Sequence, residues 1–481
     1  MKSAIIRIPQ SRNVDPLCAS RDMTLQSAVR DASPQPGAAL HLRSVLALFM
    51  LSFAIFFLSP VSDVGLDPMF SLVVSESILK HGTPVLDDVA IPRLVPSQLP
   101  SHPNLLAWRR FYQLENKNGH VLYLFPHGSS LLSLPFVAML DAAGLSAIDS
   151  KGNYSFPGER GAQKIISSIL MAIVVCIFFE TSSMLLPWRW SLIVTIGAGF
   201  GTQIWSTATR ALWSNTWEVF LAACLVLMLL KQERGSSRCS GPLLATLVSW
   251  MYFVRPTGAI TVVAVSIFTL LTNREEFLTY ALTGLAWLLA VLTYSWVVFG
   301  QLLPDYYHQG STLHVSGWLV AFAGCLVSPS RGLLIFVPSV FIVVYLVARN
   351  WNGLLSWRLA LLAIGIICAQ LFMIAGYPTW WGGWSYGPRL LTDVIPWFVV
   401  LAIMGLRAHL DDLAKTPIGT SRSINSSLLA ATALVLMLLS ITINGYGAIS
   451  MQTRYWNRKV DQRIWDWRAP QFLAGFGDLS K

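Results

Sequence analysis

Long uninterrupted runs of apolar residues dominate the chain and limit the folds that are open to it. Many of these runs are roughly 17 to 25 residues long, which is the length of helix that crosses a bilayer. Of the 481 residues, 54% are hydrophobic and only 12% are charged, a balance that excludes a soluble enzyme. In lipid, every backbone N–H and C=O group needs a partner inside the protein, and a helix supplies all of them locally. We therefore predict an all-α, polytopic integral membrane protein.

About eleven segments have the length and composition of membrane spans, and the bundle is predicted to contain about 11 to 13 transmembrane helices. One more apolar segment, residues 130–140, is left open, because if it also crosses the membrane another segment must be re-entrant. The predicted spans are residues 44–59, 162–186, 191–208, 212–230, 240–254, 257–272, 278–299, 333–348, 358–376, 390–406 and 428–447.

The distribution of lysine and arginine orients these spans. Loops on the cytoplasmic side carry an excess of both residues, and this places inside the cell the loops that contain PWRW, KQERGSSR, NREE and RNWNGLLSWR. Residues 1–43 are basic but lack the pattern of a cleaved signal peptide, so they are expected to form a cytoplasmic tail. Residues 44–447 then form the transmembrane module of a multi-pass plasma (inner) membrane protein.

The remaining loops fall on the outer face by parity. They are a long first outer loop at 60–128, expected to contain amphipathic helices, the loops 300–332 and 377–389, and the tail 448–481. The unusual polar and aromatic residues of the chain gather in these segments. A passive bundle has no reason to place such residues on one side, so we predict a functional site on the outer face.

Charge and cysteine usage exclude two further classes. The net charge of +10 is spread over the tail and short loops, with no basic run, so nucleic acid is not an expected partner and membrane lipid headgroups are. The six cysteines stand singly, mostly inside apolar runs. Neither a disulfide framework nor a CxxC metal or redox site is indicated.

Two carboxylates follow directly after the first predicted span. Asp63 and Asp67 stand at the membrane surface, ahead of an amphipathic helix that is predicted to end at Gly82. A carboxylate there can ionise, and nearby apolar walls raise its basicity, which suits a general base. The alternative is that Asp67, followed by Pro68, only caps the next helix.

The segment DPMFSLVVSESILKHG, residues 67–82, resembles the segment after the first span in the glycosyltransferase C superfamily, which includes the protein O-mannosyltransferases and the aminoarabinose transferase of lipid A. Asp67 and Gly82 stand at the matching separation, and Phe70 lies where an aromatic residue is usual. Pro68 departs from the pattern, because a second acidic residue often stands there. Further segments resemble a bacterial subgroup in the same order along the chain: residues 118–135, 255–260, 328–339, 380–397 and 455–473.

The resemblance implies a sugar donor linked to polyprenyl phosphate, an acceptor activated by a carboxylate of the first outer loop, and inversion at the anomeric carbon. Such a donor needs a cation that holds its phosphate as it leaves, and arginine does so with a planar fork. Arg331 and Arg389 are the first candidates because glycines stand beside them, and Arg255 and Arg210 are next. The alternative for each arginine is a side chain that reaches from a helix end to lipid headgroups.

Aromatic residues and one histidine complete the predicted substrate site. In WWGGWSYGPR, the three glycines are expected to bend the chain so that Arg389 points inward, while tryptophan faces stack on sugar rings. An aromatic belt at the membrane interface is the alternative for these tryptophans. His127 is a candidate donor to phosphate or sugar, or else a loop hydrogen-bonder. The predicted aromatic contacts are Trp381, Trp384 and Tyr386.

No motif for a cofactor is visible. Zinc spacings, phosphate-binding glycine loops and dinucleotide fingerprints are missing from the sequence, and so is a DxD-type pair in a later outer loop. Asp87 and Asp88 form one adjacent acidic pair, which keeps a divalent metal as the open alternative. We expect transfer without a metal or other cofactor.

These observations together predict a membrane glycosyltransferase that acts on the outer face, with Asp67, or else Asp63, as the general base. The acceptor is a glycan, a lipid or a protein. Two alternatives stay open, a transporter or flippase of lipid-linked sugars and a non-catalytic membrane scaffold related to such enzymes. A transporter should carry ionisable residues near the middle of the bilayer, whereas Glu180 and Glu218, the main examples here, lie near predicted helix ends.

Overall fold

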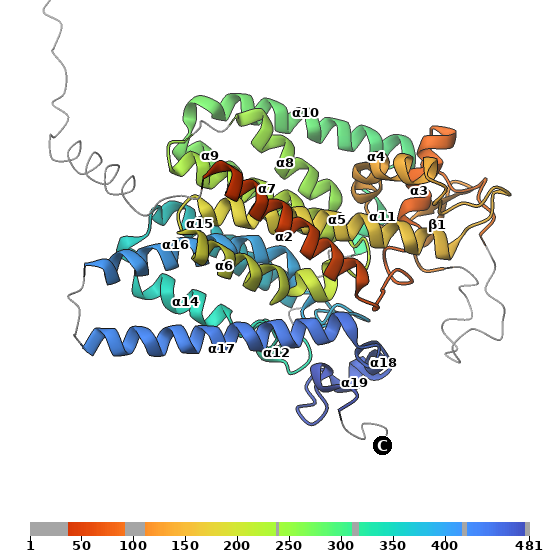
Figure 1. The fold of residues 1–481 in the computed structure, drawn as a ribbon. Coiled ribbons are helices and arrows are strands. Elements are labelled where there is room, and N and C mark those ends of the chain that lie inside the picture. The colour runs from red at the N-terminus through yellow and green to blue at the C-terminus, as the bar shows by residue number, and fades with distance from the viewer. Residues whose placement is uncertain (1–36, 92–110, 237–239, 310–316, 416–420, 477–481) are drawn as a thin grey trace, which may run out of the picture.

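The computed structural model describes residues 37–91, 111–236, 240–309, 317–415 and 421–476, and residues 1–36 of the predicted tail lie outside them. Within these ranges, seven helical stretches are long and apolar enough to cross a membrane. They lie in α2 (Ala38–Leu58), α5 (Phe156–Ser183), α7 (Ser214–Glu233), α10 (Arg274–Phe299), α15 (Trp357–Ala375), the 3-10 turn η6 (Arg389–Val394) with α16 (Ile395–Ala414), and α17 (Ser421–Ile449). Figure 1 shows these helices side by side in one bundle, which confirms the predicted all-α membrane fold.

Shorter helices fill the bundle between the long ones. They are α4 (Gly128–Ala142), α6 (Trp188–Phe200), α8 (Gly241–Val254), α9 (Ala259–Thr272), α12 (Trp318–Val327) and α14 (Val340–Arg349). The open segment 130–140 is therefore helical. It lies in α4, whose 15 residues rise only about 22 Å, less than the hydrocarbon core of about 30 Å.

All of the predicted spans fall on helical structure, but two of them are broken. The span at 191–208 changes after α6 into a π-helical turn, η3 (Ile204–Ala208). The span at 333–348 is split into α13 (Leu333–Phe336) and α14, with Pro338 between them, because proline lacks the N–H that would continue the helix. The predicted loop 300–332 is also partly helical, since it contains α11 (Asp305–Gln309) and α12.

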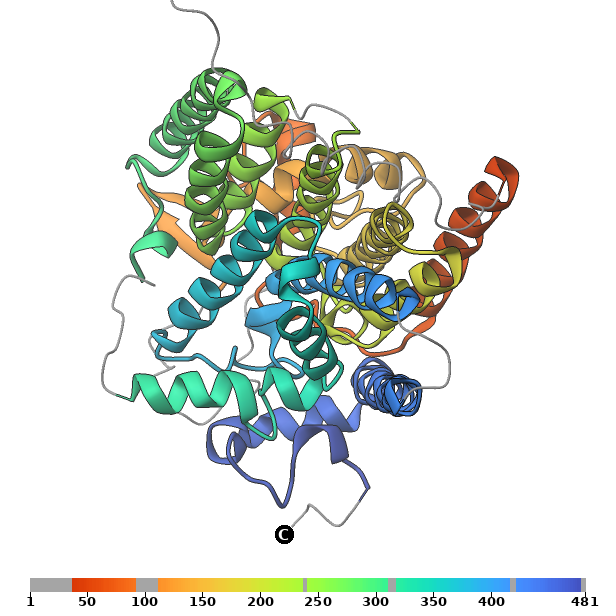
Figure 2. The same cartoon turned by 90° about the vertical axis from the view of Figure 1, so that its left-hand side faces the viewer.

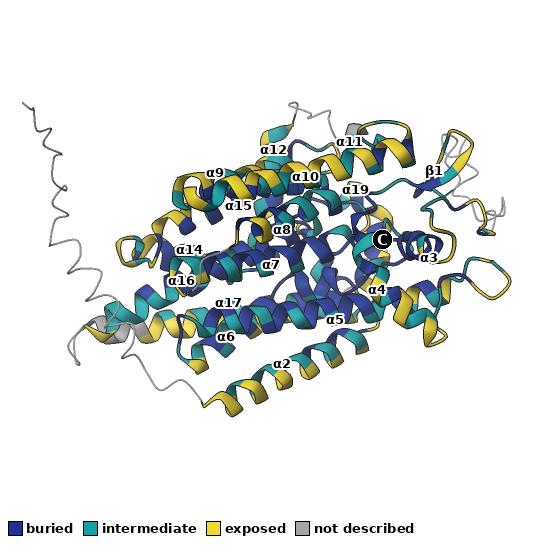
Figure 3. Cartoon of the chain, turned by 90° about the horizontal axis from the view of Figure 1, so that it is seen from above, coloured by how far each residue is buried: buried dark blue, intermediate teal, exposed yellow. Residues whose placement is uncertain are grey.

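Burial divides the long helices into a centre and a periphery. Most side chains in the apolar windows of α5, α7 and α16 are buried, whereas those of α2, α10 and α17 are largely exposed (Figure 3). Figure 2, which views the bundle nearly end-on, places α2 and α17 at its edge. A helix that is apolar and exposed at the edge of a bundle is suited to contact with lipid.

The segments that were predicted to share one face meet at one end of the bundle (Figure 1). This end contains α3 (Ser71–His81), the hairpin of β1 (Leu114–Lys117) and β2 (His120–Tyr123), α11, α18 (Gln452–Trp456) and α19 (Val460–Arg463). Ion pairs and hydrogen bonds join them. Lys117 Nζ lies 2.8 Å from Asp305, and Arg331 Nη2 donates to Asn457 over 3.0 Å.

The first of these segments is only partly helical. We predicted that residues 60–128 contain amphipathic helices, and the described part contains one helix, α3, together with a two-stranded antiparallel hairpin. Asn118 and Gly119 form its turn with φ of 53° and 90°. An Asn-Gly pair accepts this left-handed geometry readily and is a strong hairpin signal, which our reading of the sequence overlooked.

Asp87 holds the hairpin against the loop that follows α3. Its carboxylate accepts hydrogen bonds from Val121 N and His120 Nδ1, each over 2.7 Å. The backbone donor first, and then His120, lower the pKa of Asp87 below its ordinary value. Asp87 therefore has protein partners for both carboxylate oxygens, and its role in this structure is to anchor the hairpin.

Candidate functional site

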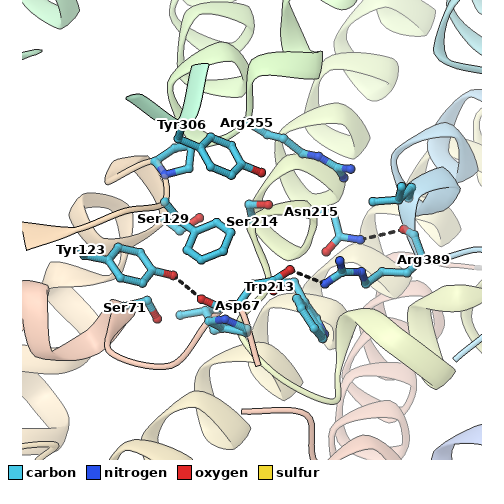
Figure 4. A pocket seen from close by; sticks show the side chains of 15 residues that line it. Asp67, Ser71, Tyr123, Ser129, Trp213, Ser214, Asn215, Arg255, Tyr306 and Arg389 are labelled. Carbon is cyan, nitrogen blue, oxygen red and sulfur yellow. Dashed lines mark hydrogen bonds and ion pairs between the residues drawn. The ribbon is translucent and has the colours of Figure 1, made fainter. Parts of the chain in front are cut away.

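A pocket opens at the end of the bundle where these segments meet. It encloses about 510 Å³ of empty space, including the part open to solvent, and its walls come from the first loop, α4, α7, the α8–α9 junction, α11 and η6. Figure 4 shows Asp67 and Trp213 on one side of this space, with Arg255 and Tyr306 on the other. The lining includes Asp67, Ser71, Tyr123, Ser129, Trp213, Asn215, Arg255, Tyr306 and Arg389.

Asp67 and Arg389 form an ion pair inside this pocket, although 322 positions separate them in sequence. Arg389 Nη1 lies 2.7 Å from Asp67 Oδ2, and the Tyr112 hydroxyl donates to Asp67 Oδ1 over 2.9 Å. The hydroxyl of Tyr123 donates to the backbone carbonyl of Asp67 over 2.6 Å, which fixes the loop (Figure 4). The Asp67 side chain remains 32% exposed, so a ligand in the pocket can reach it.

Asp67 does not cap the helix that follows it. Helix α3 begins at Ser71, and its N-cap residue is Phe70, which has a φ of 74°. The carboxylate of Glu159 on α5 accepts hydrogen bonds from Phe70 N and Leu72 N over 3.0 and 3.2 Å. Because Glu159 satisfies the free N–H groups of this helix start, the capping alternative for Asp67 does not hold.

Asp63, the other carboxylate, lies outside the pocket lining and is buried. Its nearest basic partner is Arg454, whose Nε lies 3.7 Å from Asp63 Oδ1. Burial raises the pKa of Asp63 from its ordinary 3.8 to about 6, and Arg454 offsets part of this increase. Of the two candidate bases, Asp67 alone faces the pocket.

The raised pKa of Asp63 predicts a pH-dependent effect on stability. Because folded Asp63 keeps its proton up to about pH 6, stability that is present below pH 3.8 is lost as the pH rises through 6. Asp63→Asn should therefore raise the free energy of unfolding at pH 7.5, by up to about 3 kcal/mol, and change it little at pH 4. Thermal unfolding of both proteins across this pH range measures the effect. A stability difference that does not depend on pH would show that Asp63 is not a buried acid of this kind.

The loop of residues 377–388 turns Arg389 into the pocket. Gly382, Gly383 and Gly387 have φ values of 73°, 62° and 57°, a left-handed region that glycine adopts without strain. The three glycines thus bend the chain as predicted. A Cβ at Gly387 would lie 2.7 Å from the ring of Phe336, so this position also requires the missing side chain.

The guanidinium of Arg389 contacts two side chains and leaves one buried N–H group without a partner among the described residues. Its Cζ lies 4.1 Å from the ring centroid of Trp213, a cation–π contact that holds the plane in place. Its Nη1 contacts Asp67, while the buried Nε has no hydrogen-bond partner among the described residues. A buried N–H without a partner is costly, so an acceptor that reached this group would stabilise the site.

Arg255 enters the pocket from the opposite side, at the end of α8. Its Nη1 lies 2.5 Å from Asp393 Oδ2, and its Nε lies 4.0 Å from Glu218 Oε2. All three side chains are buried. The second candidate cation is therefore held rigidly by a carboxylate behind it while it lines the pocket.

Arg331 lies away from the pocket, and its five N–H donors all have protein partners. The guanidinium joins the loop that carries Arg389 to the C-terminal segment of the chain. This leaves no donor for a phosphate. The acceptors are the carbonyls of Trp381, Ser330 and Gly383 and the side chains of Gln471 and Asn457.

Arg210 is likewise buried, and its guanidinium is hydrogen-bonded to protein groups. Its Nη2 donates to the carbonyl of Phe56 over 2.7 Å, and its Nη1 to the carbonyl of Ser59 over 3.0 Å. These carbonyls belong to the end of α2, where a positive charge also complements the helix dipole. Arg210 thus caps the C-terminus of α2 and positions the loop that contains Asp63. It does not line the pocket.

The three aromatic residues that were predicted to contact the sugar do not line the pocket. Trp384 is 52% exposed, and Trp381 packs against a small cluster formed by the C-terminal segment. Tyr386 is buried, and its hydroxyl donates to the carbonyl of Ile443 on α17 over 2.7 Å. The predicted stacking contacts are therefore not formed by these three residues. The tryptophan of the pocket is Trp213, which stands at the start of a span and which the sequence pattern did not single out.

His127 is a buried hydrogen-bonding residue beside the pocket. Its Nε2 lies 3.0 Å from the carbonyl of Tyr123, which makes Nε2 the donor, and its Nδ1 accepts from the Tyr294 hydroxyl over 2.7 Å. Burial lowers the pKa of His127 from 6.5 to about 4. It is neutral at physiological pH and lines a second, apolar cavity of about 310 Å³.

Acidic and histidine side chains do not form a metal-binding cluster among the described residues. Among the described residues, no group of three or more His, Cys, Asp or Glu side chains could hold a metal ion. The groups with chemistry in the pocket are the carboxylate of Asp67, the guanidinium groups of Arg389 and Arg255, and several hydroxyl and amide groups.

No protein-family model and no curated protein matches this chain. Among solved structures, it is similar to the crystal structure of ArnT from Cupriavidus metallidurans bound to undecaprenyl phosphate. The alignment has a TM-score of 0.42 and 12% sequence identity, and it covers 91% of this chain and 75% of that chain.

Proposed function

We propose that this integral membrane protein is a glycosyltransferase that moves a sugar from a polyprenyl-phosphate-linked donor to an acceptor hydroxyl. The observation that carries the proposal is the ion pair of Asp67 and Arg389 in a pocket at one end of a membrane bundle. A carboxylate and a guanidinium side by side supply the two groups that such a transfer needs, a proton acceptor and an anion holder. The sequence motifs in the same segments support this reading.

The two arginines of the pocket are suited to hold the donor phosphate. Arg389 offers a buried Nε that has no partner among the described residues, and Arg255 faces it across the space. Both remain charged in a partly dehydrated site, where their attraction for an anion is strongest. As the phosphate leaves, its growing negative charge is stabilised by groups that are already in position.

Asp67 is suited to accept the proton of the acceptor. As the acceptor oxygen attacks the anomeric carbon, its proton passes to the carboxylate, and the bond between that carbon and the phosphate oxygen breaks. The lipid phosphate departs with the bonding electrons. Attack from the face opposite the leaving group inverts the anomeric centre, and the acceptor can be a glycan, a lipid or a protein.

The position of the pocket favours transfer over transport. A flippase needs polar groups along a path through the middle of the bilayer, whereas the pocket here lies at the helix ends. A non-catalytic scaffold has no use for a partly exposed carboxylate with a paired arginine. The deciding experiment incubates purified protein with undecaprenyl phosphate that carries a radiolabelled sugar and follows release of the free lipid phosphate. Undecaprenyl phosphate that stays fully glycosylated with every acceptor class would refute the proposal.

We further propose that the pocket opens on the outer face of the plasma membrane. The C-terminal segment lies at the pocket end of the bundle, so an alkaline phosphatase domain fused after Lys481 should be active, as this enzyme folds only outside the cytoplasm. A fluorescent protein inserted after Gly235, in the basic segment that follows α7, should fluoresce as a cytoplasmic control. Inactive phosphatase at the C-terminus, with the protein inserted in the membrane, would place the pocket on the cytoplasmic side.

A further inference from the structure

Asn215 presents an unused hydrogen-bond acceptor to the pocket. It is the second residue of α7, only 2% exposed, and it lines the space between Arg389 and Arg255. Its Nδ2 donates to the backbone carbonyl of Arg389 over 3.1 Å, while its Oδ1 has no hydrogen-bond partner among the described residues. Figure 4 shows the amide nitrogen turned toward Arg389 and the oxygen turned toward the pocket.

The orientation of this amide is fixed by its neighbour. If the amide were flipped, its oxygen would face the carbonyl oxygen of Arg389, and two acceptors would repel each other. The group that faces the pocket is therefore a pure acceptor, and a ligand that satisfies it must bring an O–H or an N–H. A buried acceptor without a partner is unfavourable, so binding of such a ligand removes an existing cost.

Ser129 offers a second unused group from another helix. It is the second residue of α4, only 4% exposed, and its Oγ has no hydrogen-bond partner among the described residues. Ser129 also lines the pocket, and Figure 4 places it across the space from Asn215. A hydroxyl can donate or accept, so this group suits the hydroxyls of a sugar, which do both.

We infer that Asn215 and Ser129 form a hydroxyl-recognition subsite for the transferred sugar, a conclusion that rests on the proposed function. The class of group that fits is a sugar with a free hydroxyl or amino group next to Asn215. A carboxylated sugar is disfavoured there, because its carboxylate would meet an acceptor. The bond from Asn215 to the backbone of Arg389 places the sugar subsite next to the phosphate-binding residue.

The test compares binding of free undecaprenyl phosphate with binding of its sugar-linked forms, which separates sugar recognition from phosphate binding. Undecaprenyl phosphate, alone or linked to glucose, mannose, arabinose, aminoarabinose or glucuronic acid, is titrated against the purified full-length protein, and binding is followed by native mass spectrometry. The variants are Asn215→Leu, which keeps the volume, and Ser129→Ala. The loop should survive the first change, because the carbonyl of Arg389 also accepts from Thr392 Oγ1 over 2.6 Å.

A matched control lies next to Ser129. The Oγ of Ser130 is also buried without a partner among the described residues, but Ser130 does not line the pocket. We expect the unaltered protein and Ser130→Ala to prefer one of the neutral or amino sugar lipids to the free lipid phosphate. Asn215→Leu and Ser129→Ala should bind the free lipid phosphate normally. Their preference for the sugar-linked lipid over the free lipid phosphate should fall about tenfold.

Four outcomes would overturn the inference. If the variants keep the full preference, or if the glucuronic acid lipid binds best, the two residues do not read the sugar. If the unaltered protein binds all the lipids equally, no such subsite exists, although the phosphate-binding part of the proposed function would stand. If it binds none of them, the proposed function fails and the subsite fails with it.

Discussion

Replacement of Asp67 by asparagine should lower turnover by roughly a hundredfold or more, with folding and donor binding nearly intact. Asparagine keeps the shape of the side chain and can still accept the hydrogen bond from Tyr112, but it cannot take up a proton. It also removes the partner of Arg389, so the guanidinium becomes more available to a phosphate. Turnover and lipid binding measured on one preparation separate these two effects.

The structure supplies the controls for this experiment. Asp63→Asn removes the neighbouring carboxylate, which is buried outside the pocket lining, and turnover should be close to normal. Glu159→Gln alters the group that caps α3 and should lower thermal stability rather than turnover alone. Full activity in the Asp67→Asn protein would remove Asp67 from the mechanism.

Loss of Arg389 should lower turnover nearly as much as loss of Asp67, but it should also weaken donor binding. We expect Arg389→Ala to weaken donor binding and to lower turnover by about a hundredfold to a thousandfold, because the developing charge on the phosphate loses a fixed donor. Arg389→Lys should restore only part of the activity. A lysine supplies one point charge, and it cannot both contact Asp67 and present a second N–H in the same plane.

Arg331 is the informative comparison, since it stands in an equally glycine-rich motif. Because its donors all bind protein groups, Arg331→Ala should lower thermal stability by about 2 kcal/mol or more and impair binding only through that loss. If Arg389→Ala leaves turnover unchanged while a stably folded Arg331→Ala protein loses turnover selectively, Arg331 rather than Arg389 holds the donor phosphate. Activity in both variants would direct attention to Arg255.

The helices could be predicted from the sequence because the residues that favour each helix lie within it. An apolar run of membrane length specifies a helix wherever it stands, and the break in the span at 333–348 arises from a single residue, Pro338. Helix α12 was missed because its 10 residues are too short to read as a span. The Asn-Gly pair of the hairpin is also a local signal, and it could have been recognised.

The site was only partly predictable because its contacts are not local. Asp67 and Arg389 stood out through the motifs around them, yet nothing in the sequence shows that they meet. Arg331 had the same kind of motif, but its acceptors are main-chain carbonyls and amides far along the chain, which no motif records. Trp213 and Asn215 stand at the start of a span, where interfacial residues are common. The roles of all these residues in transfer stay predictions until they are measured.

The bonds around Arg331 have a consequence for how the protein matures. The loop that leads to Arg389 is bonded through Arg331 and Gln471 to a segment that the ribosome makes after α17, the last of the long apolar helices among the described residues. A nascent chain can therefore complete membrane insertion while the support of that loop is still inside the exit tunnel. We expect a premature stop codon shortly before Asn457 to yield a bundle that is inserted in the membrane but has an unsupported loop, so that activity requires translation past Gln471.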